Sequence, residues 1–200
     1  MQLNDDVHVL PLPMVRDGQT RILNLSLILD PAEGPTLVDA GLPGQLDAIA
    51  SVMAPAGVGV ADLKRIVLTH QDIDHVGSLP DLVQASGARV LAHEVEVPYI
   101  DGTERPRFDR PDFLRQFPQM AAFIERLKQV HVDEALPDGA RLDIAGGVRV
   151  VATPGHTVGH MCLYLERTRT VIAGDALIAD DGRLEGPSAA ATAGDRKSVV

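Results

Sequence analysis

The chain has 200 residues, which is the size of one domain, and its 45% hydrophobic and 23% charged residues are typical of a soluble globular protein. The formal net charge of −10 argues against nucleic acid or an anionic membrane as a partner, because binding to phosphate draws on clustered Lys and Arg. The single cysteine, Cys162, excludes an internal disulfide, and the acidic first residues lack the pattern of a signal peptide. We therefore expect a cytoplasmic protein that acts on a small molecule. Neither composition nor pattern indicates an oligomeric state.

The first half of the chain predicts alternating strands and helices. Residues 21–30 and 36–39 flank a turn rich in Pro and Gly, which predicts a β-hairpin. Apolar residues at helical spacing follow Gly44 and stop near Pro55, and a strand is predicted from Arg65 to Thr69. The remaining predicted elements of this half are a helix over Leu79 to Ala85, ended by Gly87, and a strand over Arg89 to Ala92.

The second half opens with an irregular stretch and then predicts a series of strands. The segment from Pro98 to Pro118 is rich in proline and has no sustained period, which indicates an insertion that covers a cleft or, alternatively, an inert surface loop. A helix is predicted from about Gln119 to Gln129. Successive antiparallel strands are predicted over Arg141 to Ile144, Val148 to Ala152, Met161 to Leu165 and Thr170 to Ala173.

Three loops that follow predicted strands carry potential metal ligands. The first comes directly after Thr69 and holds two His and two Asp within six positions. The second is the turn from Thr153 to His160, and the third is the pair Gly174-Asp175. Imidazole and carboxylate groups together suit zinc, iron or manganese. The candidate ligands are His70, Asp72, Asp74, His75, His156 and Asp175.

The order and spacing of these motifs resemble the metallo-β-lactamase superfamily over nearly the whole chain. The motifs are Leu37 to Gly41, T-H-Q-D-I-D-H-V-G at Thr69 to Gly77, P-G-H-T-V-G-H and the final Gly-Asp pair. The resemblance implies an α/β fold, the four-layer αββα metallo-β-lactamase sandwich, with one or two metal ions at one edge of the sheets. It also implies that His70, Asp72 and His156 bind the first metal, that Asp74 and His75 bind the second, and that Asp175 bridges the two.

One ligand position departs from the pattern of the family. The usual loop reads H-x-H-x-D-H, whereas the third position here is Asp72. A carboxylate in place of an imidazole adds one negative charge, so three acids are expected to face the ions. A less positive site lowers the pKa of bound water less and shifts the preference toward manganese or iron. Zinc remains the expected metal, with iron or manganese as alternatives.

The resemblance implies hydrolytic chemistry. Divalent ions convert bound water into hydroxide near neutral pH and polarise a substrate carbonyl, and Asp74 would act as a catalytic group that orients the nucleophile. We therefore expect a metal-dependent hydrolase of an ester, lactone, thioester or related carbonyl substrate, although the sequence does not identify the substrate. The alternatives are an iron-dependent redox protein of the same fold, a degenerate metal-free scaffold and an inactive C-terminally truncated fragment.

The C-terminal segment is short for this family. Family members continue past the Gly-Asp strand through a helix and a further strand that ends in another His, whereas 25 residues follow Asp175 here and none is His. We therefore expect the sandwich to lack its C-terminal strand and helix. The domain is expected to span residues 1–194, with residues 195–200 as a candidate foreign tail.

Other polar residues are expected to have supporting roles or none. Asp39 is interpreted as an ordinary turn acid, with a contact to the metal loop as the alternative. His160 is expected to bond within its turn and to orient His156. His93 is expected at the surface, with a position lining the pocket as the alternative, and His8 and His131 are expected to have no part in the site.

Overall fold

The computed structural model describes the chain except for residues 17–18, 117, 119–120, 126–127, 181–182 and 187–200. The larger of its sheets has six strands, in the spatial order β1-β2-β3-β4-β5-β6. The strands β1 to β3 pair antiparallel, and β3 to β6 pair parallel. The bounds are β1 Val7–Arg16, β2 Gln19–Ile28, β3 Thr36–Val38, β4 Arg65–Leu68, β5 Arg89–His93 and β6 Glu134–Leu136.

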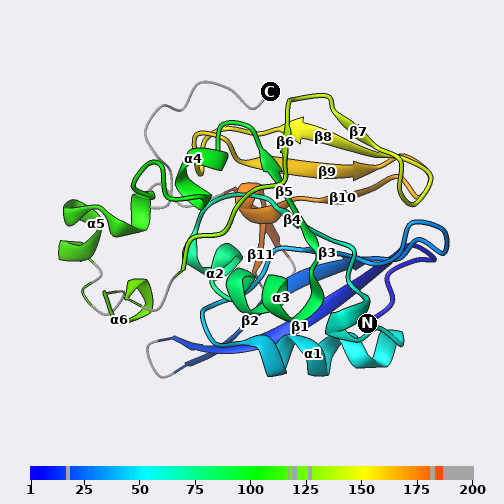
Figure 1. The fold of residues 1–200 in the computed structure, drawn as a ribbon, viewed down its shortest axis with the longest axis horizontal. Coiled ribbons are helices and arrows are strands. Elements are labelled where there is room, and N and C mark those ends of the chain that lie inside the picture. The colour runs from blue at the N-terminus through cyan, green and yellow to red at the C-terminus, as the bar shows by residue number, and fades with distance from the viewer. Residues whose placement is uncertain (17–18, 117, 119–120, 126–127, 181–182, 187–200) are drawn as a thin grey trace.

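A second, antiparallel sheet packs on the first and has the order β10-β9-β8-β7. Figure 1 shows it as a separate layer above the six-stranded sheet. Its bounds are β7 Arg141–Leu142, β8 Val148–Ala152, β9 Met161–Leu165 and β10 Thr170–Ile172. Strands β11 (Ile178–Asp180) and β12 (Arg183–Glu185) form a further hairpin.

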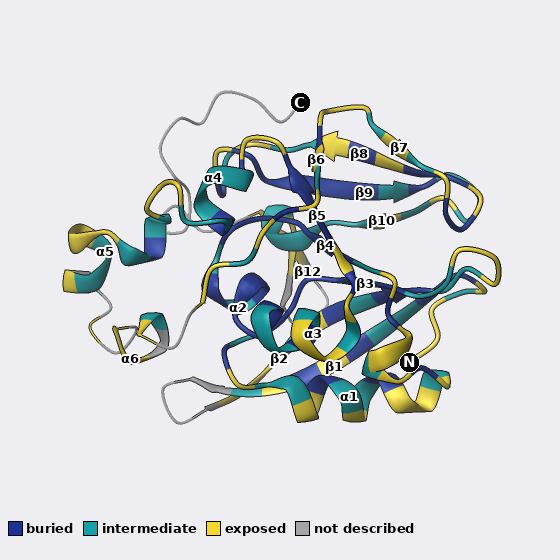
Figure 2. Ribbon diagram, viewed as in Figure 1, coloured by how far each residue is buried: buried dark blue, intermediate teal, exposed yellow. Residues whose placement is uncertain are grey.

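Helices cover the face of the six-stranded sheet that points away from the second sheet. Helix α1 (Leu46–Met53) buries Ile49 and Met53, and α3 (Leu79–Ser86) buries Leu79 and Leu82, while their outer faces stay exposed (Figure 2). The other helices are α2 Ile73–Val76, α4 Val97–Ile100, α5 Pro111–Gln116 and α6 Ala121–Ile124. Short 3₁₀ turns cover Ala54–Ala56, Val60–Asp62, Arg107–Asp109 and Gly174–Ala176.

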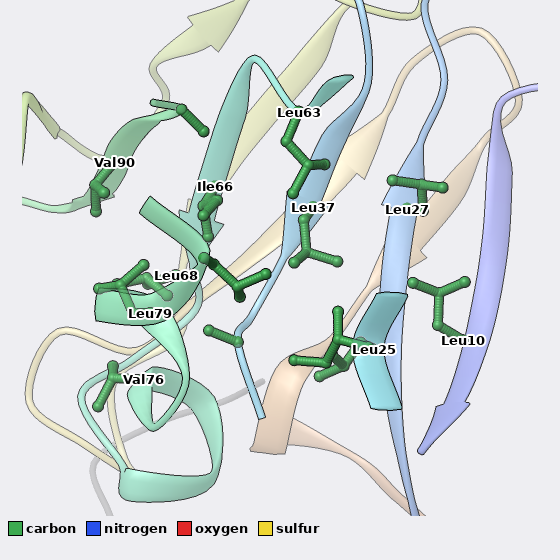
Figure 3. Close-up of a cluster of buried hydrophobic side chains, with 14 of the residues drawn as sticks. Leu10, Leu25, Leu27, Leu37, Leu63, Ile66, Leu68, Val76, Leu79 and Val90 are labelled. Atoms are coloured by element: carbon green, nitrogen blue, oxygen red, sulfur yellow. The ribbon is translucent and has the colours of Figure 1, made fainter. Parts of the chain in front are cut away.

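Two apolar clusters lie on opposite faces of the six-stranded sheet. Leu37, Ile66 and Leu68 point to the helices, and Figure 3 shows them with Leu79 in the cluster on that side. Val38 and Val67, the alternate residues of the same strands, point to the second sheet and meet its buried strand residues. Successive side chains of a strand point to opposite faces, and both faces of β3 and β4 are covered, so apolar residues follow one another directly in Leu37–Val38 and Ile66–Leu68.

The structure confirms the predicted fold class and most of the predicted elements. The hairpin, the helix after Gly44, the strand before the His/Asp loop, the helix ended by Gly87 and the late antiparallel strands all form. Gly87 adopts the left-handed conformation that ends a helix, with φ 67°. Within the described residues, the layers seen are helices, the six-stranded sheet and the four-stranded sheet. Val151 and Val171 lie exposed on the outer face of that last sheet.

Some elements were not predicted. Strand β1 contains Pro11 and Pro13, which hide its alternating sequence pattern. The strand still forms because it lies at the edge of the sheet, where a missing backbone N–H is tolerated. The three residues of β6 are too few to show a period and form a strand by pairing with β5. The helix predicted over residues 119–129 is seen as α6, and residues 119–120 and 126–127 lie outside the described part. The candidate tail, 195–200, also lies outside it.

No helix among the described residues is long and apolar enough to cross a lipid bilayer.

Candidate metal centre

The predicted ligands come together at one end of the two sheets. The parallel strands β3 and β4 both run toward this end, and the chain that leaves β4 delivers the His/Asp loop and α2 there (Figure 1). The turn between β8 and β9 brings His156, and the 3₁₀ turn after β10 brings Asp175. The carboxyl ends of parallel strands are the usual place for a site in an α/β sheet, because the connecting loops converge there.

Four imidazole rings form the centre of this cluster. The ring centroid of His70 lies 4.0 Å from that of His75, 4.7 Å from that of His156 and 5.0 Å from that of His160. All four residues are buried. Buried polar rings need partners, since burial removes the water that would otherwise bond to their nitrogens.

The first set of ligand atoms is spaced as the shell of one metal ion would be. Atoms bound at about 2.1 Å to a tetrahedral ion lie about 3.4 Å apart. The Oδ2 atom of Asp72 lies 3.0 Å from Nε2 of His156 and 3.6 Å from Nε2 of His70. Nε2 of His156 lies 3.3 Å from Oδ2 of Asp175. His70, His156 and Asp175 also form a group whose ligand atoms all lie within 4.8 Å of one another.

The second set is looser and shares Asp175 with the first. Nε2 of His75 lies 3.3 Å from Oδ1 of Asp175 and 4.0 Å from Oδ1 of Asp74. One oxygen of Asp175 therefore faces His156 while the other faces His75, as a carboxylate bridging two ions would require. The side chain of Asp74 is 35% exposed, so this part of the cluster is open to solvent.

The buried ring nitrogens test whether these residues suit a metal ion. Among the described residues, Nε2 of His70 and Nε2 of His75 are buried and have no partner with hydrogen-bond geometry, although each faces a carboxylate at 3.6 Å and 3.3 Å, respectively. Their other nitrogens contact Thr69 and Asp39, so the unpartnered atoms are the ones that point at the carboxylates of the cluster. An ion held by His70, Asp72, His156 and Asp175, with a second at His75 and Asp74, would satisfy them, and the donor set suits zinc, iron or manganese.

Arg107 is a member of the cluster that the sequence analysis did not include. Its Nε donates to Oδ1 of Asp72 at 2.7 Å, and its Nη2 pairs with Oδ2 of the same carboxylate. Its Nη1 donates to the carbonyl oxygen of His156 at 2.9 Å, and Nη2 lies 3.1 Å from Nε2 of that residue. The guanidinium offsets the negative charge that the carboxylate of Asp72 adds, so the expectation of a less positive site from Asp72 alone was wrong. Arg107 lies in the aperiodic segment from Pro98 to Pro118, where no sequence pattern pointed to it.

Asp39 contacts the metal loop, so its interpretation as an ordinary turn acid was wrong. Its Oδ2 lies 2.9 Å from Nδ1 of His75, and Oδ1 accepts the backbone N–H of Thr69 at 2.8 Å. The hydroxyl of Thr69 lies 2.9 Å from both carboxylate oxygens. The φ of Asp39 is 66°, a conformation that few residues other than Gly adopt, and these contacts offset its cost. Asp39 fixes the ring of His75 so that Nε2 faces the cluster.

His160 supports Asp175 rather than His156. Its Nδ1 lies 2.7 Å from the hydroxyl of Thr153, within the turn as expected, and its Nε2 accepts the backbone N–H of Asp175 at 3.1 Å. Burial, with the neighbouring His70 and His156, lowers the pKa of His160 to about 3. The ring is therefore neutral at physiological pH and carries its proton on Nδ1, since Nε2 is the acceptor.

The pKa shifts show that the cluster stabilises positive charge. Burial opposes ionisation of Asp72, but bonds from His156, His70 and Arg107 hold its pKa well below the usual value. Burial likewise opposes ionisation of Asp175, and His75 with the other rings lowers its pKa. Burial disfavours the imidazolium of His75, yet the carboxylates of Asp39, Asp74 and Asp175 hold its pKa well above the usual value. Ionised carboxylates around His75 favour a cation there, and a divalent ion would displace the proton.

Three other histidines were expected to lie outside the site. His93 is buried rather than at the surface, so that expectation was wrong, and its Nε2 has no partner among the described residues. His131 is exposed, and His8 lies on β1, at the edge of the six-stranded sheet.

Gly77 is needed for close packing rather than for a turn. Its φ is −61°, which any residue adopts, but a Cβ at this position would lie 2.3 Å from the backbone nitrogen of Pro43. Its N–H donates to the carbonyl oxygen of Gly41 at 2.8 Å. The glycine therefore lets α2 pack against the loop that follows β3 and carries Asp39.

The chain is similar in sequence to curated hydrolases. The chain is 30% identical over 191 residues to the probable metallo-hydrolase YflN of Bacillus subtilis (strain 168), covering 84% of this chain and 70% of YflN. It is 31% identical over 134 residues to the hydroxyacylglutathione hydrolase of Acidiphilium cryptum (strain JF-5), covering 66% of this chain and 42% of that enzyme.

Solved structures of metallo-beta-lactamase proteins have the same fold as this chain. The metallo-beta-lactamase family protein TTHA1429 from Thermus thermophilus matches with a TM-score of 0.72 and 31% identity, covering 88% of this chain and 61% of that one. BJP-1, a subclass B3 metallo-beta-lactamase of Bradyrhizobium japonicum, matches with a TM-score of 0.64 and 22% identity, which shows the fold alone. The chain spans 58% of BJP-1. The sequence pattern of the metallo-beta-lactamase superfamily matches residues 20–199, and the chain therefore belongs to this superfamily of metallo-hydrolases.

Proposed function

We propose that this protein hydrolyses an ester, lactone, thioester or related carbonyl substrate with one or two divalent metal ions, zinc being the expected metal. The observation that carries the proposal is the position of Asp175, whose two oxygens lie 3.3 Å from Nε2 of His156 and 3.3 Å from Nε2 of His75. One carboxylate thus links two sets of ligand atoms, which is the arrangement that a two-metal hydrolytic site needs.

The proposed division of the ligands is the one that the resemblance to the superfamily implies, and the distances in the cluster support it. His70, Asp72 and His156 would hold the first ion, Asp74 and His75 the second, and Asp175 both. When bound, such ions supply Lewis acidity to a substrate carbonyl and lower the pKa of bound water.

The chain's own residues orient the reacting groups. Asp74 offers a partly exposed carboxylate beside His75, where it can accept a hydrogen bond from the attacking water and hold it in line. Arg107 holds the carboxylate of Asp72 at both oxygens and so fixes its rotamer. Asp39 fixes the orientation of the His75 ring through its contact with Nδ1.

The choice of carbonyl substrates rests on the family and on one relative. Hydroxyacylglutathione hydrolase is 31% identical to this chain over 134 residues, which supports including thioesters with esters and lactones. The match covers 42% of that enzyme, so we propose the thioester class and not the specific substrate of hydroxyacylglutathione hydrolase.

The test combines metal analysis with a substrate panel. Purified protein is analysed for zinc, iron and manganese and assayed with p-nitrophenyl acetate, an acyl-homoserine lactone and an S-acyl thioester, before and after treatment with a chelator. We expect bound metal, turnover of at least one class, and loss of turnover on chelation that the metal restores. Bound metal with no turnover of any class would contradict the hydrolase proposal.

Variants connect the activity to the site. Asp175→Asn and His156→Ala should each clearly lower the metal content and lower turnover about a hundredfold, because each removes a proposed ligand. His131→Ala, which alters an exposed histidine, should retain both. Unchanged metal content in Asp175→Asn and His156→Ala would contradict the ligand assignment.

A further inference from the structure

We propose that Glu96 is a positioning residue that joins the two loops carrying the first set of ligands. This inference rests on the proposed function, because it takes His70, Asp72 and His156 as the ligands. Glu96 immediately precedes α4, outside both ligand-bearing loops, and its side chain is fully buried.

The carboxylate of Glu96 accepts four hydrogen bonds. Its Oε2 accepts the backbone N–H of Gln71 at 3.0 Å and the side-chain amide of the same residue at 2.9 Å. Its Oε1 accepts the hydroxyl of Thr157 at 2.6 Å and the backbone N–H of Gly159 at 2.7 Å. A buried carboxylate is costly unless its oxygens are satisfied, and here four donors satisfy them.

Three of these four donors belong to residues directly beside proposed ligands, and the fourth, the N–H of Gly159, lies in the same turn as His156. Gln71 stands between His70 and Asp72, and Thr157 follows His156. The loop after β4 and the turn after β8 are far apart in the sequence, and the carboxylate fixes the backbone of both. A shift of one loop relative to the other would change the 3.0 Å separation between Oδ2 of Asp72 and Nε2 of His156 and the 4.7 Å separation between the ring centroids of His70 and His156. The bonds of Glu96 therefore set the geometry between the two loops.

Gly159 is required for this close approach. A Cβ at position 159 would lie 2.9 Å from Cγ of Glu96 and 2.8 Å from Cβ of Val95. Both separations are shorter than a side chain allows, so the turn could not bring its N–H to the carboxylate with a larger residue. The close packing of the turn against Glu96 therefore explains the second glycine of the P-G-H-T-V-G-H motif, Gly159.

The network continues to Arg107. The side-chain oxygen of Gln71 accepts the backbone N–H of Arg107 at 2.9 Å, while its amide group donates to Glu96. The amide of Gln71 thus fixes the start of the 3₁₀ turn from which the guanidinium reaches Asp72 and His156. Glu96 consequently positions Asp72 both through the loop that bears it and through Arg107.

The test measures metal affinity and does not require catalysis. Wild type and Glu96→Gln are stripped of metal and titrated with Co²⁺ against a chelating indicator, and the visible spectrum of the bound Co²⁺ is recorded. Gln keeps the size of the side chain but places an N–H₂ group against the hydrogen-bond donors of Gln71 or of Thr157 and Gly159. We therefore expect the affinity for the first Co²⁺ to fall about tenfold to a hundredfold and the visible spectrum of the bound Co²⁺ to change. Glu96→Asp, which keeps the charge but is shorter, should recover part of the affinity.

Asp6→Asn is the matched control. Asp6 is also a buried acid, but it pairs with Arg167 and is not among the contacts of the cluster. We expect this variant to lose stability in urea while its affinity for Co²⁺ stays within about twofold of wild type. A role of Glu96 in folding alone would make the two variants behave alike.

A second pair of variants keeps the proposal testable should Glu96→Gln not fold. Thr157→Val removes one donor to Glu96, and Thr36→Val removes an equally buried hydroxyl that has no hydrogen-bond partner in the described part of the chain. We expect affinity for Co²⁺ to fall severalfold in Thr157→Val and to stay unchanged in Thr36→Val. Unchanged affinity and spectrum in Thr157→Val, or in a folded Glu96→Gln, would overturn the role of Glu96. A wild type that binds no Co²⁺ would instead contradict the proposed function.

Discussion

The two halves of the cluster are each backed by a buried acid, but the acids act in different ways. Behind His75, Asp39 contacts the ligand ring itself, 2.9 Å from Nδ1. Behind His70 and His156, Glu96 contacts the backbone and side chains of their neighbours. Asp39 therefore controls the tautomer of one ligand, whereas Glu96 controls the separation of two loops.

The difference reflects how each half is built. His75 and Asp74 belong to one turn of helix, α2, so their spacing is local and only the ring of His75 needs to be fixed. His70 and His156 lie on different loops and are 86 positions apart in the sequence, so the distance between them depends on long-range contacts. A site assembled from distant segments needs a group that connects them, and a carboxylate with four acceptor positions can do so.

Replacing Asp39 tests this comparison with the largest expected effect. Asp39→Asn keeps a residue that tolerates a positive φ but removes the charge beside His75, so affinity for the second ion should fall about tenfold to a hundredfold. The first ion should be affected less. Stepwise Co²⁺ titration followed by absorbance separates the two events, and Asp47→Asn, an exposed acid of α1, serves as the control. Equal losses for both ions would show that the halves are not independent.

Replacing Asp72 sharpens the comparison within the first half. Asp72→His restores the usual ligand of the family, so the ratio of zinc to manganese affinity should rise about tenfold. The guanidinium of Arg107 then loses the carboxylate of Asp72 that offsets its charge and therefore repels the ions, so adding Arg107→Met should raise zinc affinity further. Competition between the two metals measures the ratio. Arg105→Met alters a largely exposed neighbour and should change nothing. A constant ratio in Asp72→His would mean that Asp72 does not bind the metal.

Replacing Asp30 gives the smallest effect and shows what an acid remote from the cluster contributes. Its Oδ1 accepts the N–H of Glu33 and Ala32, and its Oδ2 accepts that of Ala145 at 2.6 Å, which connects the two sheets. Asp30→Asn should lower the free energy of unfolding by about 1–2 kcal/mol and leave metal affinity unchanged.

The pH dependence of this effect has a definite sign. The bonds from Glu33 and Ala145 hold the pKa of Asp30 below its ordinary 3.8. Its contribution to stability is therefore complete above pH 3.8 and is lost as the pH falls through the lower pKa of the folded protein. Urea unfolding of wild type and Asp30→Asn between about pH 7 and about pH 3 should converge at the acid end. A difference that persists unchanged at the acid end would rule out the charge as its source.

Much of this architecture could be predicted because its signals are local. The apolar runs of β3 and β4, the helical spacing of α1 and the glycine that ends α3 depend on residues within one element. The six candidate ligands were also found from sequence, since His and Asp directly after strands form a dense pattern, and the structure brings all six to one place. The assignment of each to a particular ion stays a proposal.

The chain's own sequence thus determines most of the strands and where the ligand loops begin, because period and turn residues act over short distances, whereas β6 depends on its pairing with β5. The partners behind the ligands were decided only by the tertiary structure. Glu96 reaches Thr157 across 61 positions and Arg107 reaches Asp72 across 35, and neither pair has a sequence period. Asp39 took its role from the parallel pairing of β3 with β4, which places its carboxylate against Thr69 and His75. Contacts of this kind exist only once the sheets have packed, since burial is what makes each of these acids require a partner.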